Sequence, residues 1–280
     1  EALPDLVSWP EGNVFLARRL LARLPRGTLR TGAFVVDVRN HEDEVRVTTW
    51  DPELGATHLW RGRACVFAAP KLRADLVLPE LGEAGRSGHL RLTYSPWLVA
   101  NLLVNRMPEH AAARLAWDNL VHGSWSLGFI HNGHLTEPAW EPEDSKSLTF
   151  YACFSGATRE GARRDLLSLD WDSWARLVVG ELERVAPAIR PEISRLDIWR
   201  WGHAMVRPAP GMIWGGLRRE LSAPLGRIFF ASNDSGVLPL YEEAVYQGVR
   251  AAEEAIGALG RPFGSLLAPV RERGSPSSPL

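Results

Sequence analysis

Near its C-terminal end the chain places an apolar run, a polar loop and an amphipathic segment in succession. The apolar run, residues 228–231, is short and follows a basic turn, which is typical of a strand buried on both faces of a parallel sheet. From Tyr241 onward, small or apolar residues recur three and four positions apart, which predicts a helix with one stripe packed on that sheet. The stripe contains Ala244, Val245, Gly248, Ala251, Ala252 and Ala255. The loop would then lie where open α/β sheets bind ligands, although an ordinary strand-to-helix connection has the same pattern.

The first quarter of the chain predicts one helix followed by a β meander. Apolar positions three and four apart predict an amphipathic helix over residues 14–24, which Pro25-Arg26-Gly27 ends. Alternating and apolar runs separated by polar turns then predict four strands. These strands cover residues 28–39, 44–50, 58–63 and 64–69.

Beyond Lys71 the pattern changes to shorter segments with scattered Trp, His and Pro. Strands are predicted over residues 90–94, 97–105, 126–131, 147–153 and 193–201, and helices over 159–167 and 171–185. A mostly antiparallel sheet covered by helices fits these elements. We therefore divide the chain into residues 1–70, a second domain over 71–212, a return segment over 213–260, and a flexible tail over 261–280.

The order of motifs resembles the flavin-containing amine oxidase superfamily. Ala231-Ser232-Asn233 closes the buried strand and Glu242-Glu243-Ala244 opens the helix, with Gly248, Arg250 and Ala251-Ala252 further along, as in the C-terminal signature of that superfamily. Upstream, a Pro-x-Gly turn, a helix and a meander that returns in Ala68-Ala69-Pro70 follow the same order. The resemblance implies an α/β fold of mixed α+β character. In it, part of an FAD-binding Rossmann-like domain is joined to an antiparallel-sheet substrate domain.

The resemblance also implies residues that contact FAD. Asn233 stands at the acidic position that bonds the ribityl chain, and its neighbour Asp234 is able to substitute for it. Val35 matches the position that contacts adenine. The helix start that approaches the flavin pyrimidine corresponds to Leu240, Tyr241 and Glu242. Glu243 replaces a family Gly, and we expect its carboxylate to point to solvent or to cap the helix, since facing a reduced flavin would be repulsive.

For the substrate, the resemblance points to the segment that leads back towards the flavin. Trp201, His203, Ala204 and Met205 are the candidate pocket residues there. Ala204 and Leu240 replace the two aromatic cage positions of amine-oxidising members, and the flavin-facing lysine of many members falls near Ala100 or Asn101. These departures disfavour small amines and favour an apolar substrate. The sequence assigns no catalytic residue.

Composition narrows the class of protein. The 280 residues carry a formal charge of −1 and are 45% hydrophobic, with twelve Trp, so a core or an aromatic pocket is expected and a nucleic-acid interface is not. No apolar run reaches the length of a membrane span, and a chain with only two cysteines and no leader pattern is expected to be cytoplasmic. His131 and His134 lie in a turn without further ligands, so no metal is expected.

One family element is missing from the sequence. No Gly-x-Gly-x-x-Gly occurs, and the chain begins without Met, so we expect a fragment whose FAD site an upstream segment or a partner chain completes. Two interpretations follow. The first is an FAD-dependent oxidoreductase that removes hydride from a C–N or C–C bond of an apolar small-molecule substrate. The second is a non-catalytic remnant, or a hydrophobic-ligand binding module, without a complete cofactor site.

Overall fold

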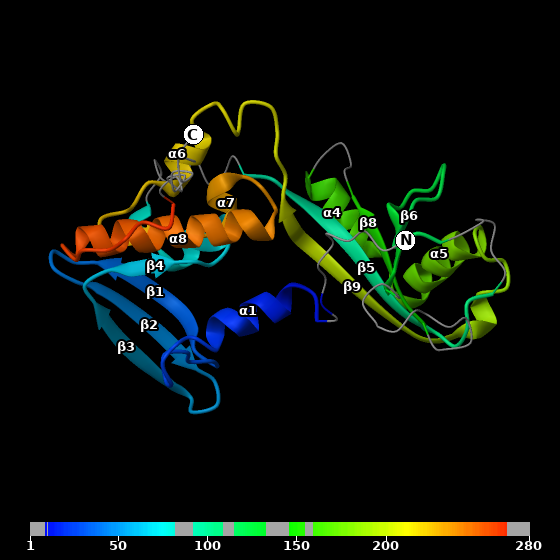
Figure 1. Ribbon diagram of the computed structural model, residues 1–280, viewed down its shortest axis with the longest axis horizontal. Coiled ribbons are helices and arrows are strands. Elements are labelled where there is room, and N and C mark those ends of the chain that lie inside the picture. The colour runs from blue at the N-terminus through cyan, green and yellow to red at the C-terminus, as the bar shows by residue number, and fades with distance from the viewer. Residues whose placement is uncertain are drawn as a thin grey trace, which may run out of the picture. The chain divides into compact units, whose positions relative to one another are not determined.

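The structure is a computed structural model that describes residues 9, 11–81, 92–108, 115–132, 146–154 and 159–267. The chain divides into two compact units. Unit 1 comprises residues 1–26 and 93–206, and unit 2 comprises residues 27–92 and 207–280 (Figure 1).

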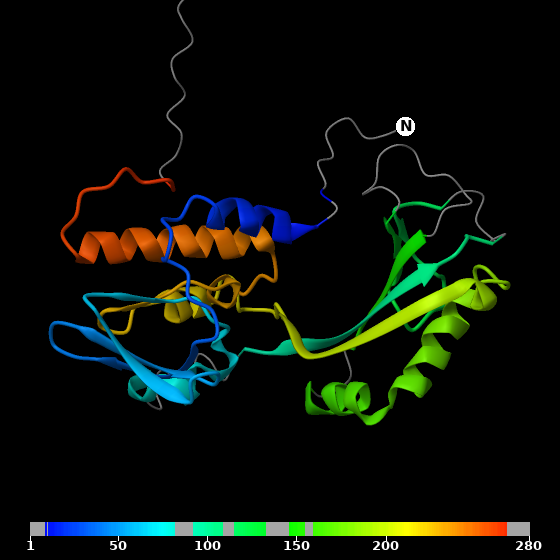
Figure 2. The same ribbon diagram turned by 90° about the horizontal axis from the view of Figure 1, so that it is seen from below.

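Unit 1 is built on a five-stranded antiparallel sheet with the strand order β6-β7-β8-β5-β9. Its strands are β5 (Tyr94–Val104), β6 (Asp118–Asn119), β7 (Gly128–His131), β8 (Lys146–Cys153) and β9 (Ile193–Val206). Helices α4 (Arg159–Ser168) and α5 (Trp171–Glu183) lie along one face of this sheet (Figure 2). Helix α1 (Asn13–Leu21) confirms the predicted N-terminal helix, three residues shorter at its end than expected.

The core of unit 1 lies between the sheet and α5. Alternate residues of β5 are buried, so one face of the strand packs inward while the other stays accessible. Helix α5 begins at Asp170, whose side chain accepts a hydrogen bond from the Ser173 backbone N–H and so caps the helix. The helix then buries a stripe three and four residues apart. The core side chains include Leu98, Ala100, Leu102, Val104, Leu148, Phe150, Trp174, Val178 and Leu182.

Unit 2 contains two small sheets. Strands β1 (Phe34–Asn40), β2 (Val45–Asp51) and β3 (Ala56–Gly62) form the predicted antiparallel meander. Strand β4 (Cys65–Phe67) was expected to continue that meander, but it pairs in parallel with β10 (Ile228–Phe230) instead. The apolar run of β10 is buried at all three positions, as the sequence predicts. Helices α2 (Ala74–Val77), α6 (Leu217–Ser222), α7 (Asn233–Gly236) and α8 (Tyr241–Ala258) complete the unit.

Three further expectations are corrected by the structure. Strand β5 begins at Tyr94 and runs through residues 95 and 96, where the sequence predicted a break, and residues 90 and 91 of the predicted strand lie outside the described part of the chain. The loop after β10 contains the short helix α7. The stripe of α8 is narrower than predicted, because Ala251 and Ala255 pack on β10 while Val245 is 42% exposed. Of the predicted tail, residues 268–280 lie outside the described part of the chain.

Candidate functional site

The loop between β10 and α8 is tied to the end of β4. The backbone N–H of Lys71, which follows β4, donates a hydrogen bond of 2.7 Å to Asp234 Oδ2, and Asp234 is only 3% exposed. One oxygen of this predicted cofactor ligand is therefore used inside the protein. Asn233 is half-buried at the start of α7. Val237 ends α7 with a φ of 57°, which is strained for a β-branched residue and marks a constrained loop.

The start of α8 presents Leu240, Tyr241 and Glu242 beside this loop. Leu240 is 52% exposed, Glu242 is exposed and Tyr241 is half-buried. Helix α8 is 18 residues long and begins at Tyr241, and because its N-cap residue is Leu240, its first N–H groups are left without a capping side chain. Such a helix start favours a negatively charged or polar ligand atom.

Glu243 does not take the position expected from the sequence. Its carboxylate accepts hydrogen bonds from Arg218 at 3.1 Å and from Gln247 at 2.8 Å, and its side chain is 12% exposed. A Cβ on Gly236 would overlap the same carboxylate, so a larger residue there would have to displace the Glu243 side chain. Glu243 thus neither faces solvent nor caps α8. Instead, its ion pair with Arg218 links α6 to α8.

Arg250, the arginine of the Gly-x-Arg motif, attaches α8 to the buried strand. Its guanidinium donates to the Phe230 carbonyl oxygen, to Gln247 Oε1 at 2.8 Å and to the Glu254 carboxylate at 2.8 Å. The motif therefore has a structural role, since it fixes the middle of α8 relative to the end of β10. Val35, the predicted adenine contact, lies apart from this loop on the β1 meander and is 45% exposed.

In unit 1, the four predicted pocket residues all lie on β9. Trp201 is 51% exposed and Met205 is 39% exposed, while Ala204 is half-buried. The His203 ring lies edge-on to the Tyr94 ring with centroids 6.1 Å apart. Of the predicted four, Trp201, His203 and Met205 are thus exposed.

The prediction from the sequence did not include the aromatic neighbours of Trp201. Trp199 stacks on Trp201 at 6.0 Å, and Trp97 lies directly opposite Trp201 in the pairing of β5 with β9. Trp97 in turn stacks on Tyr151 of β8, with centroids 6.1 Å apart and ring planes 2° from parallel. We call these four rings, Trp97, Tyr151, Trp199 and Trp201, the aromatic band. It crosses three adjacent strands on the face of the sheet away from α4 and α5.

The aromatic band ends at a carboxylate. Tyr151 Oη donates to Asp118 on β6, with distances of 2.9 and 3.0 Å to its two oxygens. Burial, together with the hydrogen bond and the negative charge of Asp118, raises the pKa of Tyr151 to about 12, so the phenol stays protonated. Between these strands, Gly128 stands opposite Tyr151, and a Cβ there would overlap the Asn119 carbonyl oxygen. Glycine therefore allows β6 to approach closely enough for Asp118 to meet Tyr151.

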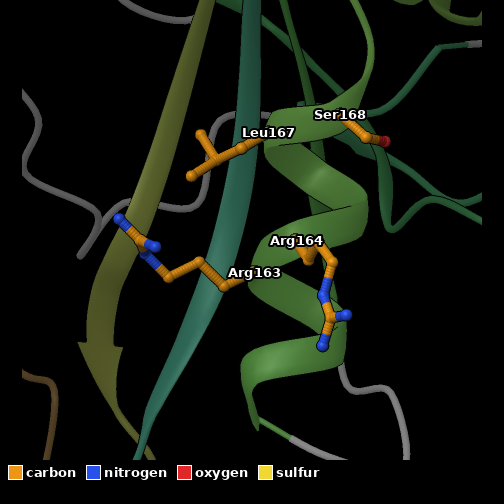
Figure 3. Close-up of a pocket in the computed structure, with 4 residues that line it drawn as sticks. All are labelled: Arg163, Arg164, Leu167 and Ser168. Atoms are coloured by element: carbon orange, nitrogen blue, oxygen red, sulfur yellow. The ribbon is translucent and has the colours of Figure 1, made fainter.

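The opposite face of the sheet carries a different feature. Arg163, Arg164, Leu167 and Ser168 of α4 line a shallow pocket of about 440 Å³ (Figure 3). Arg163 extends towards β9, where Gly202 leaves room for its guanidinium. None of the predicted pocket residues lines this pocket. Among the described residues, no group of His, Cys, Asp and Glu is arranged to hold a metal ion, and no helix combines the length and hydropathy of a membrane span.

Comparison with known proteins identifies the family. The family model for flavin-containing amine oxidoreductases matches residues 7–256. The chain belongs to this family. The resemblance drawn from the C-terminal motif and the meander is thus confirmed, and the family is one of flavoproteins. No match was found among curated proteins.

Solved structures of this family share the fold. Cyclohexylamine oxidase from Brevibacterium oxydans IH-35A is 14% identical with a TM-score of 0.66, covering 89% of this chain and 53% of its own. Putrescine oxidase bound to putrescine is 14% identical with a TM-score of 0.67, covering 88% of this chain and 53% of its own. The fold expected from the sequence, with mixed helices and sheets and an antiparallel sheet, is therefore confirmed. The chain spans about half the length of these oxidases.

Proposed function

We propose that this chain is part of an FAD-dependent oxidoreductase that removes hydride from a C–N or C–C bond of an apolar small molecule. The observation that carries the proposal is the family match over residues 7–256. A flavin, when bound, accepts the two electrons and the hydride of the substrate. The role left to the residues of this chain is binding and orientation. The family fold alone does not name the substrate.

Unit 2 has groups that suit a dinucleotide at the carboxyl end of β10. Ser232 and Ser235 are buried there, and their hydroxyl groups have no hydrogen-bond partner within the described residues. Unpartnered buried hydroxyls of this kind are uncommon, because each costs about 1–3 kcal/mol. Phosphate and ribityl oxygens would satisfy them, so these residues fit the cofactor. We propose that Asn233 and the uncapped start of α8 orient the ribityl and pyrimidine ends.

The aromatic band supports the choice of an apolar substrate. Trp199 and Trp201 are each more than half exposed, which is unusual for stacked indole rings on a sheet. Covering such rings gains about 25 cal/mol for each Å² of apolar area removed from water. We propose that the substrate lies on this band, with Met205 extending the apolar surface along β9. Asp118 and Tyr151 would then contact any polar group at the end of the substrate.

The position of Asn101 supports the exclusion of small amines. Ala100 is fully buried in the core, whereas Asn101 is exposed on the open face of the sheet and its Oδ1 accepts a hydrogen bond from Thr149. A flavin-facing lysine in this segment would therefore need the place that Asn101 occupies. The two cage positions, Ala204 and Leu240, offer no ring to enclose an ammonium group.

Rapid mixing tests the proposal. The full-length gene product is loaded with FAD and mixed with a panel of small primary amines and a panel of apolar compounds, while flavin absorbance is followed. We expect reduction by members of the apolar panel and little by the amines. Trp201→Leu should slow this reduction at least tenfold, whereas Trp214→Leu serves as a matched control, because Trp214 is 92% exposed and lies outside the aromatic band.

Two outcomes would contradict the proposal. Fast reduction by small amines alone would assign the protein to the ordinary amine oxidases and exclude an apolar substrate. A full-length protein that purifies without flavin and takes up none would favour the second interpretation, a non-catalytic hydrophobic-ligand binding module. In that case apolar compounds should still bind, and Trp201→Leu should weaken them while Trp214→Leu does not.

A further inference from the structure

Lys71 is buried in an environment that does not balance a charge. It follows Ala68-Ala69-Pro70, the segment after β4, and is 1% exposed. Its Nζ lies 3.5 Å from the centroid of the Phe230 ring and has no hydrogen-bond partner in the described part of the chain. Lysine is rarely buried without a partner, because removing an ammonium group from water is costly. The sequence, which contains only two lysines, gives no indication of this burial.

Two further donors without partners lie in the same region. Ser232 lies two residues after β10, at the N-cap of α7, and Ser235 directly follows Asp234, the residue to which the Lys71 backbone donates. Because β4 and β10 are parallel neighbours, their carboxyl ends lie at the same edge of the sheet. Ligands of α/β sheets bind at this edge. We call Lys71, Ser232 and Ser235 the donor cluster.

The charges around the donor cluster come from three elements. Asp234 of α7 raises the pKa of Lys71, while Arg250 of α8 lowers it. Arg250 is itself held by Glu254 and by the Phe230 carbonyl, and Glu243 of α8 is paired with Arg218 of α6. Burial is the largest effect on Lys71, and it lowers the pKa to about 7. An anion arriving at this edge would therefore find a lysine that gains a proton readily.

We propose that the donor cluster binds the oxygens of a phosphate group, with Lys71 Nζ as the charged donor and the two serine hydroxyls beside it. The inference rests on the proposed function, in which this phosphate belongs to the pyrophosphate of FAD. Lysine is a common phosphate ligand, and its four-carbon stem lets the ammonium group move from the Phe230 ring to a ligand at the sheet edge. Bound phosphate would give all three donors the partners they lack. It would also supply the negative charge that stabilises protonated Lys71.

Nuclear magnetic resonance of the lysine side chains tests this directly, because the 280-residue chain contains only Lys71 and Lys146. The chain is labelled with carbon-13 at the lysine ε position, and each signal is followed over pH with no addition, then with inorganic pyrophosphate, FAD or riboflavin at millimolar concentration. Lys71→Met and Lys146→Met assign the two signals. We expect pyrophosphate and FAD to raise the titration midpoint of Lys71 by about one pH unit or more, whereas riboflavin, which has no phosphate, leaves it unchanged.

Binding measurements supply the second readout. Each unit of pKa shift corresponds to a tenfold change in affinity, so Lys71→Met should weaken FAD about tenfold in fluorescence titrations, and Lys146→Met should not. Ser232→Ala with Ser235→Ala should weaken FAD and pyrophosphate alike. A shift with FAD but not with free pyrophosphate would also support the site and would show that the dinucleotide must present the phosphate.

Other results would overturn the inference. If FAD binds while the Lys71 signal stays in place, the donor cluster is not the phosphate site, although the proposed function survives. An equal response to riboflavin, or an equal movement of the Lys146 signal, would also exclude it. If FAD fails to bind in any form while pyrophosphate still shifts Lys71, the phosphate site stands and the proposed function fails. The wild-type experiment remains decisive even where Lys71→Met does not fold.

Discussion

The aromatic band of unit 1 and the donor cluster of unit 2 depart from an ordinary protein in opposite ways. In the band, the Tyr151 hydroxyl is hydrogen-bonded to Asp118, but large apolar rings such as Trp199 remain exposed. In the donor cluster, the side chains are buried, but those of Lys71, Ser232 and Ser235 have no hydrogen-bond partners among the described residues. The aromatic band thus leaves apolar area exposed to solvent, and the donor cluster has donors without hydrogen-bond acceptors.

This difference indicates what each region binds. Exposed apolar area is stabilised by a ligand that removes it from water, so the affinity of the band should depend on the size of an apolar substrate. Buried donors are stabilised by a ligand that supplies oxygen atoms and charge, so the affinity of the cluster should depend on pH and on phosphate. Exposed apolar rings and buried donors without acceptors both lower the free energy of unfolding of the protein. The comparison can therefore be tested without any ligand.

The largest effect is expected from the pH dependence that Lys71 causes. Its pKa is about 7 in the folded protein and 10.5 in its ordinary state, so between these values the unfolded chain binds more protons. The free energy of unfolding should therefore rise as pH increases from about 7 to 10.5, by at most about 5 kcal/mol. Lys71→Met should remove this rise and stabilise the protein at pH 6, as urea unfolding at several pH values will measure.

Lys146→Met is the matched control, because Lys146 is also buried but lies in unit 1. It should leave the rise in stability between pH 7 and 10.5 in place. A wild-type protein whose stability is flat over this range would mean that Lys71 stays charged in the folded state. The contrast between the exposed rings of the band and the buried, uncharged donors of the cluster would then disappear.

Local patterns predicted the elements well where one stripe is buried. Trp174, Val178 and Leu182 repeat at helical spacing, and α5 begins where Asp170 supplies a cap, so its limits were nearly correct. By contrast, the partner of β4 could not be read from local pattern, because β10 lies more than 160 residues away in the sequence. The burial of Lys71 was not predicted either, because it depends on the same pairing, which brings the segment after β4 next to Asp234 of α7.

The candidate site could likewise be predicted only where it follows from local sequence motifs. Motif matching singled out the strand end at Asn233 and Asp234, and it singled out Trp201 on β9, whose roles stay predictions. It missed Tyr151 and Asp118, because their contact depends on the register of three strands and on a glycine between them. It also misjudged Glu243, since the ion pair with Arg218 joins segments 25 residues apart.

The two faces of the unit 1 sheet should respond very differently to truncation. Phe150 is 1% exposed in the core, and Phe150→Ala should cost about 3–5 kcal/mol, as for other buried aromatic residues. Trp199→Ala removes a larger side chain, but one that is 54% exposed, so it should cost less than about 1 kcal/mol. Urea unfolding of both variants measures this. Equal costs would mean that the aromatic band is part of the core and has no free surface for a substrate.

The smallest effect concerns Glu243 and its neighbour Glu242, both in the first turn of α8. Each carboxylate interacts with the helix start, but only Glu243 is held by Arg218 and Gln247 in a half-buried position. Replacing each residue by Gln removes one charge from the same helix turn, so the two variants lose a similar helix-dipole contribution. Glu243→Gln should therefore destabilise the protein by about 1 kcal/mol more than Glu242→Gln, because it leaves Arg218 without its ion pair.

Chemical unfolding at neutral pH measures the difference, and raising the salt concentration should reduce it only slightly, since partly buried pairs are weakly screened. If the two variants are equally stable, the Arg218 contact contributes nothing. The Glu243 carboxylate would then be free to turn towards solvent, as the sequence alone suggests.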